Sequence, residues 1–77
     1  MKYLDGQPVM LGDKVDLGGG MLGVVVAVVD EDQFATGYAK ADWGVLGRGA
    51  LVNSGEAGLV HYEEASEDFL LVERSVR

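Results

Sequence analysis

The chain has 77 residues, which is enough for one domain with a small core, since a protein of this size buries only about 60–65% of its unfolded surface. Six basic and thirteen acidic side chains give a net charge of −7, and because nucleic-acid binding depends on phosphate neutralisation, this charge disfavours it. Cysteine is absent, which excludes disulfides and thiolate metal sites and favours a cytoplasmic location; no apolar run approaches the ~20 residues that span a bilayer.

The first predicted element is a short edge strand near the N-terminus. Turn signals at Asp5-Gly6 and Gly12-Asp13 bracket the segment 7–11, and Tyr3 and Leu4 lead into it. Pro8 has no N–H to donate to a sheet, so we expect it at an edge or in a turn.

Two strands joined by a glycine turn follow. Val15 and Leu17 alternate with polar residues, residues 24–29 form a run rich in β-branched side chains, and glycines between them supply the positive φ angles of a tight reversal. The spacing Gly18-x-Gly20-x-x-Gly23 also matches the dinucleotide-binding pattern. That motif must open a helix, whereas here valines follow, so we expect a hairpin turn and no cofactor.

The longest predicted connection runs from Gln33 to Gly47. It contains three aromatic residues, Phe34, Tyr38 and Trp43, among several glycines. Residues 41–46 have the spacing for a single helical turn, and the glycines argue against a longer helix. We expect an ordered Ω-type loop here.

Three more strands complete the predicted fold. Residues 50–53 and 58–62 form a hairpin-like pair around a turn at 54–56, and residues 68–74 form the last strand. Short strands separated by turn signals predict an all-β protein, with residues 1–77 forming one small, closed or partly open barrel of about five strands. Whether residues 24–29 lie at its centre or pair with a second copy stays open, so a homo-oligomer is a further alternative.

The first hairpin and the turn before it contain the pattern Gly12-Asp13-x-Val15-x-Leu17-x-x-Gly20-x-x-Gly23-x-Val25, which covers about a fifth of the chain. This pattern resembles a KOW element, the loop-and-strand unit of SH3-like barrels in translation and transcription factors, and the resemblance implies a small SH3-like, partly open five-stranded barrel. In such proteins this geometry often contacts RNA through basic residues. The acidic charge of this chain departs from that pattern, so the resemblance implies the fold and leaves nucleic-acid binding as the rival function.

Three further segments extend over the whole chain: Tyr3-Leu4-Asp5-Gly6-x-Pro8-Val9-x-Leu11-Gly12-Asp13, Trp43-x-x-Leu46-x-x-Gly49-x-Leu51-Val52 and Gly58-Leu59-Val60-His61-Tyr62. With these segments the chain is similar to small acidic bacterial proteins of uncharacterised families, some of which are associated with secreted toxin genes as immunity partners. The resemblance implies a protein partner.

Catalysis has one candidate residue, the single histidine. His61 lies in an apolar strand, and Ser54 and Ser66 are the nearest hydroxyls in sequence. Both serines lie in turn contexts, and no Gly-x-Ser-x-Gly nucleophile elbow is present. We therefore expect His61 to be structural or to face a partner, and the protein not to be an enzyme. A small hydrolase would instead lose turnover on replacement of His61.

Two acidic clusters and the aromatic loop are the candidate partner-binding residues. Consecutive carboxylates in a turn lack the alternating calcium-loop pattern, so no metal site is expected. An acidic surface favours a basic protein partner, and an exposed aromatic beside charges has the anatomy of an interface, although the aromatics could instead cap the barrel. The candidates are Asp30, Glu31, Asp32, Phe34, Tyr38, Trp43, Glu63, Glu64, Glu67 and Asp68.

Together these patterns favour a non-enzymatic, cytoplasmic binding module. Its most specific form is an immunity-type inhibitor that occludes a basic cleft of a bacterial toxin, with an aromatic from residues 34–43 as anchor. The rival is a translation- or nucleic-acid-associated module that uses the KOW-like turn. RNA binding that weakens steeply with salt would distinguish the rival.

Overall fold

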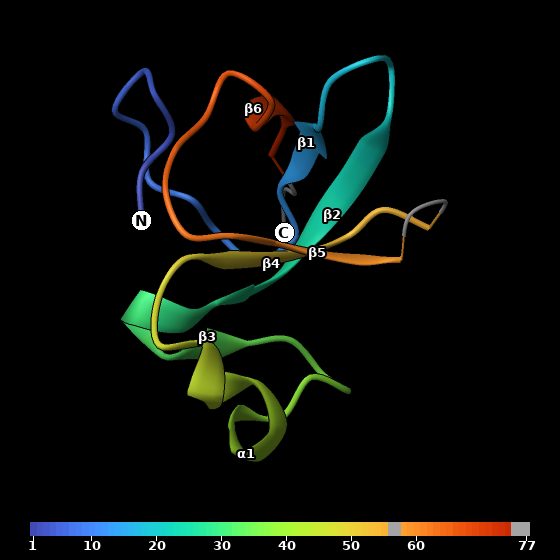
Figure 1. Ribbon diagram of the computed structural model, residues 1–77. Coiled ribbons are helices and arrows are strands. Elements are labelled where there is room, and N and C mark those ends of the chain that lie inside the picture. Colours follow the sequence, from blue (N-terminus) through green and yellow to red (C-terminus); the bar gives the residue numbers. More distant parts are fainter. Residues whose placement is uncertain (56–57, 75–77) are drawn as a thin grey trace.

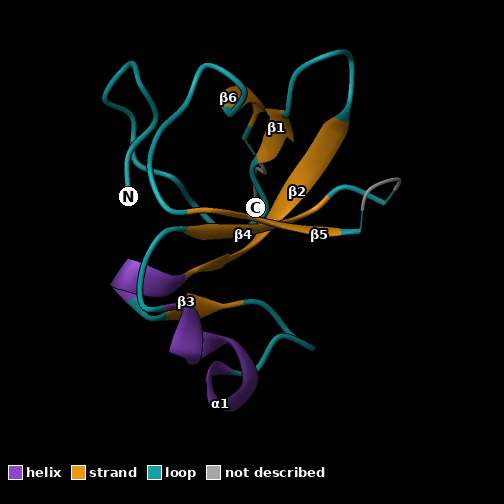
Figure 2. Cartoon of the chain, in the orientation of Figure 1, coloured by secondary structure: helices purple, strands orange, loops and turns teal. Residues whose placement is uncertain are grey.

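The computed structural model describes residues 1–55 and 58–74 (Figure 1). Its strands are β1 (Lys14–Asp16), β2 (Leu22–Val28), β3 (Gln33–Phe34), β4 (Ala50–Asn53), β5 (Leu59–Tyr62) and β6 (Leu70–Glu73). One short helix, α1 (Lys40–Trp43), and two 3₁₀ turns, Val29–Glu31 and Gly44–Leu46, complete the regular structure. Most of the remaining chain is loop and turn (Figure 2).

The six strands form one antiparallel sheet. The order is β5-β4-β2-β1-β6, and β3 pairs separately with β2. Because β5 and β6 stand at opposite ends of this order, the sheet is not closed into a barrel. The predicted all-β, partly open fold is confirmed, as is the single helical turn, α1. The additional strand is the two-residue β3, inside the stretch that was predicted as loop.

The first hairpin forms as predicted. Val15 of β1 pairs with Gly23 of β2, and β2 lies between β1 and β4 at the centre of the sheet. Residues 25–29 are buried. The glycine motif therefore leads into a strand, as the valine run predicts, and Gly23 packs so closely on β4 that an added Cβ would lie 2.5 Å from Val52 Cγ1.

The main core lies inside the curl of the sheet (Figure 1). Phe69 is fully buried there, and its ring stacks on Tyr62 at 4.8 Å and contacts Tyr3 at 5.1 Å between centroids. The N-terminal segment contributes Tyr3 and Val9 to this core. The prediction of an edge strand there was wrong: the segment makes only one isolated bridge, Lys2 to Pro8, because its apolar side chains fill the open end of the sheet.

A second, smaller core lies on the outer face of the sheet. Val26, Ala27 and Leu51 are buried there beneath the connection between β3 and β4. Side chains from β3 and from this connection pack over them, namely Phe34, Ala35, Tyr38, Trp43 and Leu46. The connection thus covers one part of the outer face.

A buried carboxylate connects both ends of the chain. Asp13 is fully buried and accepts hydrogen bonds from the Tyr3 hydroxyl (2.7 Å) and the Met10 N–H (3.0 Å). The Arg74 guanidinium donates to the same carboxylate at 3.1 and 3.2 Å and to the Pro8 carbonyl at 2.7 Å. A buried charge needs such partners to be tolerated.

The burial of Tyr3 predicts alkaline instability. Burial, together with the hydrogen bond to Asp13, raises the pKa of the Tyr3 hydroxyl far above 10.0. The folded protein then holds a proton that the unfolded chain releases above about pH 10, so the free energy of unfolding falls as the pH rises beyond that value. We expect denaturant titrations from pH 9 upward to show this fall, and a shallower fall in Tyr3→Phe. A slope unchanged in Tyr3→Phe would contradict the assignment.

Candidate protein-interaction surface

The fold brings the two predicted acidic clusters together. The Arg48 guanidinium donates to Glu63 (3.3 Å) and Glu64 (3.5 Å), and the N–H of the next residue, Gly49, donates to Asp30 at 2.9 Å. Residues 48 and 49 therefore join a cluster that follows β2 to one that follows β5. We call the joined carboxylates the acidic surface; they are Asp30, Glu31, Asp32, Glu63 and Glu64.

Asp30 is the structural centre of this surface. Its carboxylate accepts the Gly49 N–H and forms an ion pair with the terminal amine of Met1. Burial opposes ionisation of this carboxyl, but the amine and the Gly49 N–H outweigh it and hold the pKa of Asp30 below its usual value. Glu31 also contacts the amine, at 3.3 Å. Asp30 thus stabilises the fold as well as contributing charge.

The other members of the acidic surface are exposed. Glu63 and Glu64 have 61% and 78% of their side-chain surface in solvent, and their Arg48 partner 59%. Asp32 pairs at 2.8 Å with Lys40 of α1, and both side chains are more than 60% exposed. Exposed ion pairs of this kind contribute only about 0–1 kcal/mol to folding stability. Little stability is therefore lost when such a carboxylate exchanges its lysine or arginine for another cation.

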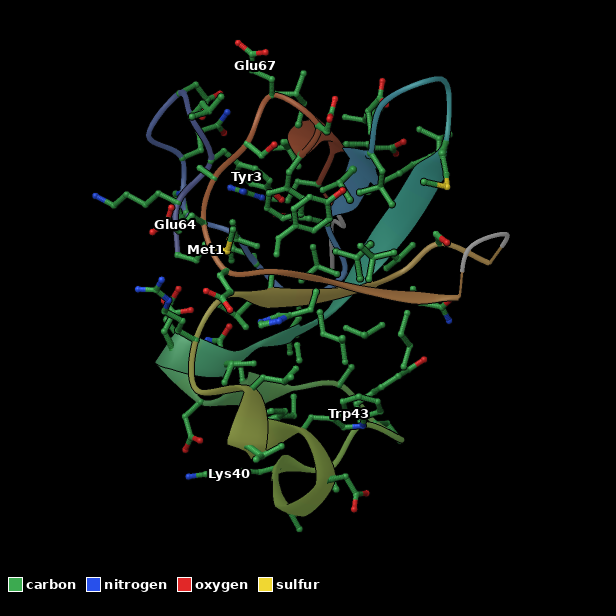
Figure 3. The ribbon with its side chains drawn as sticks, in the orientation of Figure 1. Met1, Tyr3, Lys40, Trp43, Glu64 and Glu67 are labelled. Carbon is green, nitrogen blue, oxygen red and sulfur yellow. The ribbon has the colours of Figure 1, made fainter. Side chains whose placement is uncertain are left out.

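Glu67 and Asp68 are not part of the acidic surface. They lie further along the connection from β5 to β6, and Glu67 is well separated from Glu64 (Figure 3). Asp68 lies beside the glycine turn of the first hairpin, where a Cβ added to Gly18 would be 2.8 Å from its carboxylate oxygen. The predicted second cluster is therefore divided between two places.

The three aromatic candidates are partly buried in the outer core. Phe34, Tyr38 and Trp43 pack on Val26, Ala27 and Leu51. Each retains some exposure, and the Tyr38 hydroxyl accepts a hydrogen bond from Asn53 at 3.2 Å. Trp43 lies on the opposite side of the sheet from Glu64 (Figure 3). The alternative raised from the sequence placed these aromatics over the open end of the barrel, whereas they cover part of the outer face of the sheet.

The catalytic alternative gains no geometric support. His61 Nε2 lies 2.7 Å from the backbone carbonyl of Arg48. The Ser54 hydroxyl donates to the Gly58 carbonyl at 3.1 Å, and the Ser66 hydroxyl accepts from the Asp68 N–H at 3.1 Å. All three side chains thus stabilise local backbone structure.

Residues 1–55 and 58–74 form no pocket and no cluster of histidine and carboxylate side chains arranged to hold a metal ion. Within the same residues, no helix is long and apolar enough to cross a membrane.

Sequence reasoning missed several residues that organise these surfaces. Arg48 and Gly49 join the two acidic clusters, and Asp13 with Arg74 ties the termini together. Asp13 was interpreted only as part of a turn, since a Gly-Asp pair is a common turn signal. Arg48 carried a weak signal, because it is the only basic residue between positions 41 and 73.

Comparisons of the chain with protein-family models, with curated proteins and with solved structures return no match. The acidic surface is the candidate site that the described residues define.

Proposed function

We propose that this protein is a non-enzymatic binding module for a basic protein partner. In its most specific form it is a cytoplasmic, immunity-type inhibitor that occludes a basic cleft of a bacterial toxin. The observation that supports the proposal is the convergence of two sequence-distant acidic clusters at Arg48 and Gly49. Clustered like charges on one surface attract a complementary surface and accelerate association.

The cations of this chain that pair with the acidic surface can be displaced by cations of a partner. Arg48 and Lys40 keep Glu63, Glu64 and Asp32 paired in the free protein, with little net stabilisation because all are exposed. A partner lysine or arginine can replace either cation. Binding then needs no rearrangement of the backbone, since the 3₁₀ turn Val29–Glu31 and β5 directly precede these residues and fix their backbone positions.

The aromatic segment, residues 34–43, contacts the acidic surface at one ion pair. Lys40 at the start of α1 pairs with Asp32, so this helical turn borders one carboxylate of the acidic surface, while Trp43 lies on the opposite side of the sheet from Glu64 (Figure 3). In the proposal a partly exposed aromatic of this segment anchors the partner while the carboxylates form the charged rim.

Glu63→Lys with Glu64→Lys tests the acidic surface. These two positions are preferred to Asp30, whose substitution would also disturb the Met1 and Gly49 contacts. Used as bait in lysate of the source cells, the double variant is expected to lose a basic protein that the wild type captures. With the purified partner, the association rate should fall by about tenfold or more at low salt, and less at high salt.

Asp5→Lys with Glu67→Lys is the matched control. It makes the same change in net charge at exposed positions outside the acidic surface, so capture should persist and the rate should fall much less. Equal slowing by both double variants would show that net charge alone steers association and would contradict the placement of the site. Capture of RNA with ribosomal proteins, lost as salt rises, would instead support the nucleic-acid alternative.

A further inference from the structure

Exposed apolar side chains gather on one part of the sheet, away from the acidic surface. Among the described residues eight large apolar side chains are exposed, and five of them lie on β2, β5 and β6. The five are Leu22, Val24, Leu59, Leu70 and Val72. We call them the apolar patch.

Strand register shows that the patch occupies one face. Directly paired residues of neighbouring strands project to the same side of a sheet. One row of paired residues crosses three strands: Leu70, Asp16 and Leu22. The next row crosses five strands: Glu73, Lys14, Val24, Asn53 and Leu59. Val72 lies in the irregularity beside Lys14, where the register of β6 shifts.

This face is the uncovered continuation of the outer core. Leu51 and Asn53 lie two residues apart on β4 and so share the outer face; Leu51 is buried beneath the aromatic segment, while Asn53 is exposed. The hydrogen bond from Asn53 to Tyr38 marks where the cover ends. Beyond this point the same face continues to Val24 and Leu22, and no other described part of the chain covers these two side chains.

The charges on this face favour a second copy over a basic partner. Lys14 stands between two carboxylates, Asp16 two residues along β1 and Glu73 opposite on β6, and it has no ion pair within the described residues. Two chains that each carry a net charge of −7 repel each other when other parts of their surfaces meet. Two antiparallel copies of this face can instead place the Lys14 of one beside the acidic residues of the other, because a two-fold interface matches a surface with itself.

We propose that the protein forms a two-fold homodimer through the apolar patch. The interface buries the five apolar side chains against their copies, with Lys14 facing Asp16 or Glu73 of the second chain. The patch lies at the end of the sheet where β2 and β5 begin, whereas the acidic surface follows the ends of β2 and β5. The dimer therefore leaves both acidic surfaces free, and it does not depend on the proposed function.

Light scattering and sedimentation equilibrium test the dimer, with samples from about 10 µM to about 1 mM covering weak affinities. The wild type should approach twice the 8.2 kDa of the chain as concentration rises. Added salt should preserve or strengthen the dimer, because it screens repulsion between acidic chains. Val24→Glu should raise the dissociation constant about tenfold or more, since it places a carboxylate in the interface.

Val24→Glu suits the test because the new carboxylate can pair with Lys14 across the strands of the monomer, which helps the fold to persist. Val45→Glu is the matched control, with the same charge change at a valine that is 86% exposed outside the patch; it should still dimerise. Independently, NMR spectra of the wild type on dilution should shift amides of β1, the start of β2 and β6, and not those of residues 63–64. A wild type that stays monomeric throughout, or dimer affinity unchanged in Val24→Glu, would overturn the proposal.

Discussion

Replacement of Asp13 by alanine is expected to lower the free energy of unfolding by about 3–5 kcal/mol. The buried carboxylate accepts hydrogen bonds from Tyr3, Met10 and Arg74, and its removal leaves the buried Tyr3 hydroxyl and the part-buried Met10 N–H without their acceptor. A domain of 77 residues is typically stable by about 4–12 kcal/mol, so this loss is a large share of the total. Urea or thermal unfolding followed by circular dichroism measures it.

Two comparisons separate the buried network from the general loss of an acidic residue. Asp42→Ala removes an exposed carboxylate on α1 and should change stability by less than about 0.5 kcal/mol. Combining Asp13→Ala with Arg74→Ala should cost less than the sum of the two single changes, because each single variant already breaks their shared contact. Strict additivity, or a small effect of Asp13→Ala, would show that the network does not hold the termini.

Local patterns were sufficient to predict most of the sheet. The valine run and the glycine turn predict β2 and its hairpin, because β-branched density and positive φ angles are properties of adjacent residues. The pairs β4–β5 and the last strand follow from the same kind of signal, and so does the short helical turn α1.

The N-terminal segment and the buried network could not be predicted in this way. Tyr3 and Val9 become core residues only because the curled sheet leaves an open end that they fill, which is a property of the assembled sheet. Asp13 and Arg74 are 61 residues apart, so no local pattern shows that they meet. The same reason explains the acidic surface: composition identified its members, but their convergence depends on Arg48, 15 residues before Glu63.

The two surfaces together have a consequence for binding. The proposed homodimer would carry two acidic surfaces, so it would bind two molecules of the proposed basic partner, or one partner with two basic sites. Bivalent engagement can raise apparent affinity well beyond that of one site. Val24→Glu would then weaken capture on a densely coated partner surface while leaving binding to a single immobilised partner unchanged.

Gly49→Ala is expected to destabilise the protein by about 3 kcal/mol or more, because it combines backbone strain with overpacking. Gly49 has a φ of +91°, and an added Cβ would overlap the Tyr62 carbonyl oxygen and lie 2.8 Å from Glu63 Cα. Both obstacles are backbone atoms that no side-chain rotation can move. Equilibrium unfolding in urea measures the loss.

Gly47→Ala measures the cost of backbone strain alone, so the difference between the two variants gives the steric component of the loss. Gly47 lies in the same connection with a φ of +81°, but a Cβ there meets no atom within 4 Å, so its cost should be only the strain of about 1–2 kcal/mol. The excess loss in Gly49→Ala then measures how tightly the entry to β4 is packed against the end of β5. Since the Gly49 N–H also binds Asp30, this packing holds the two acidic clusters together. Equal losses in both variants would show that the clusters meet without such close packing.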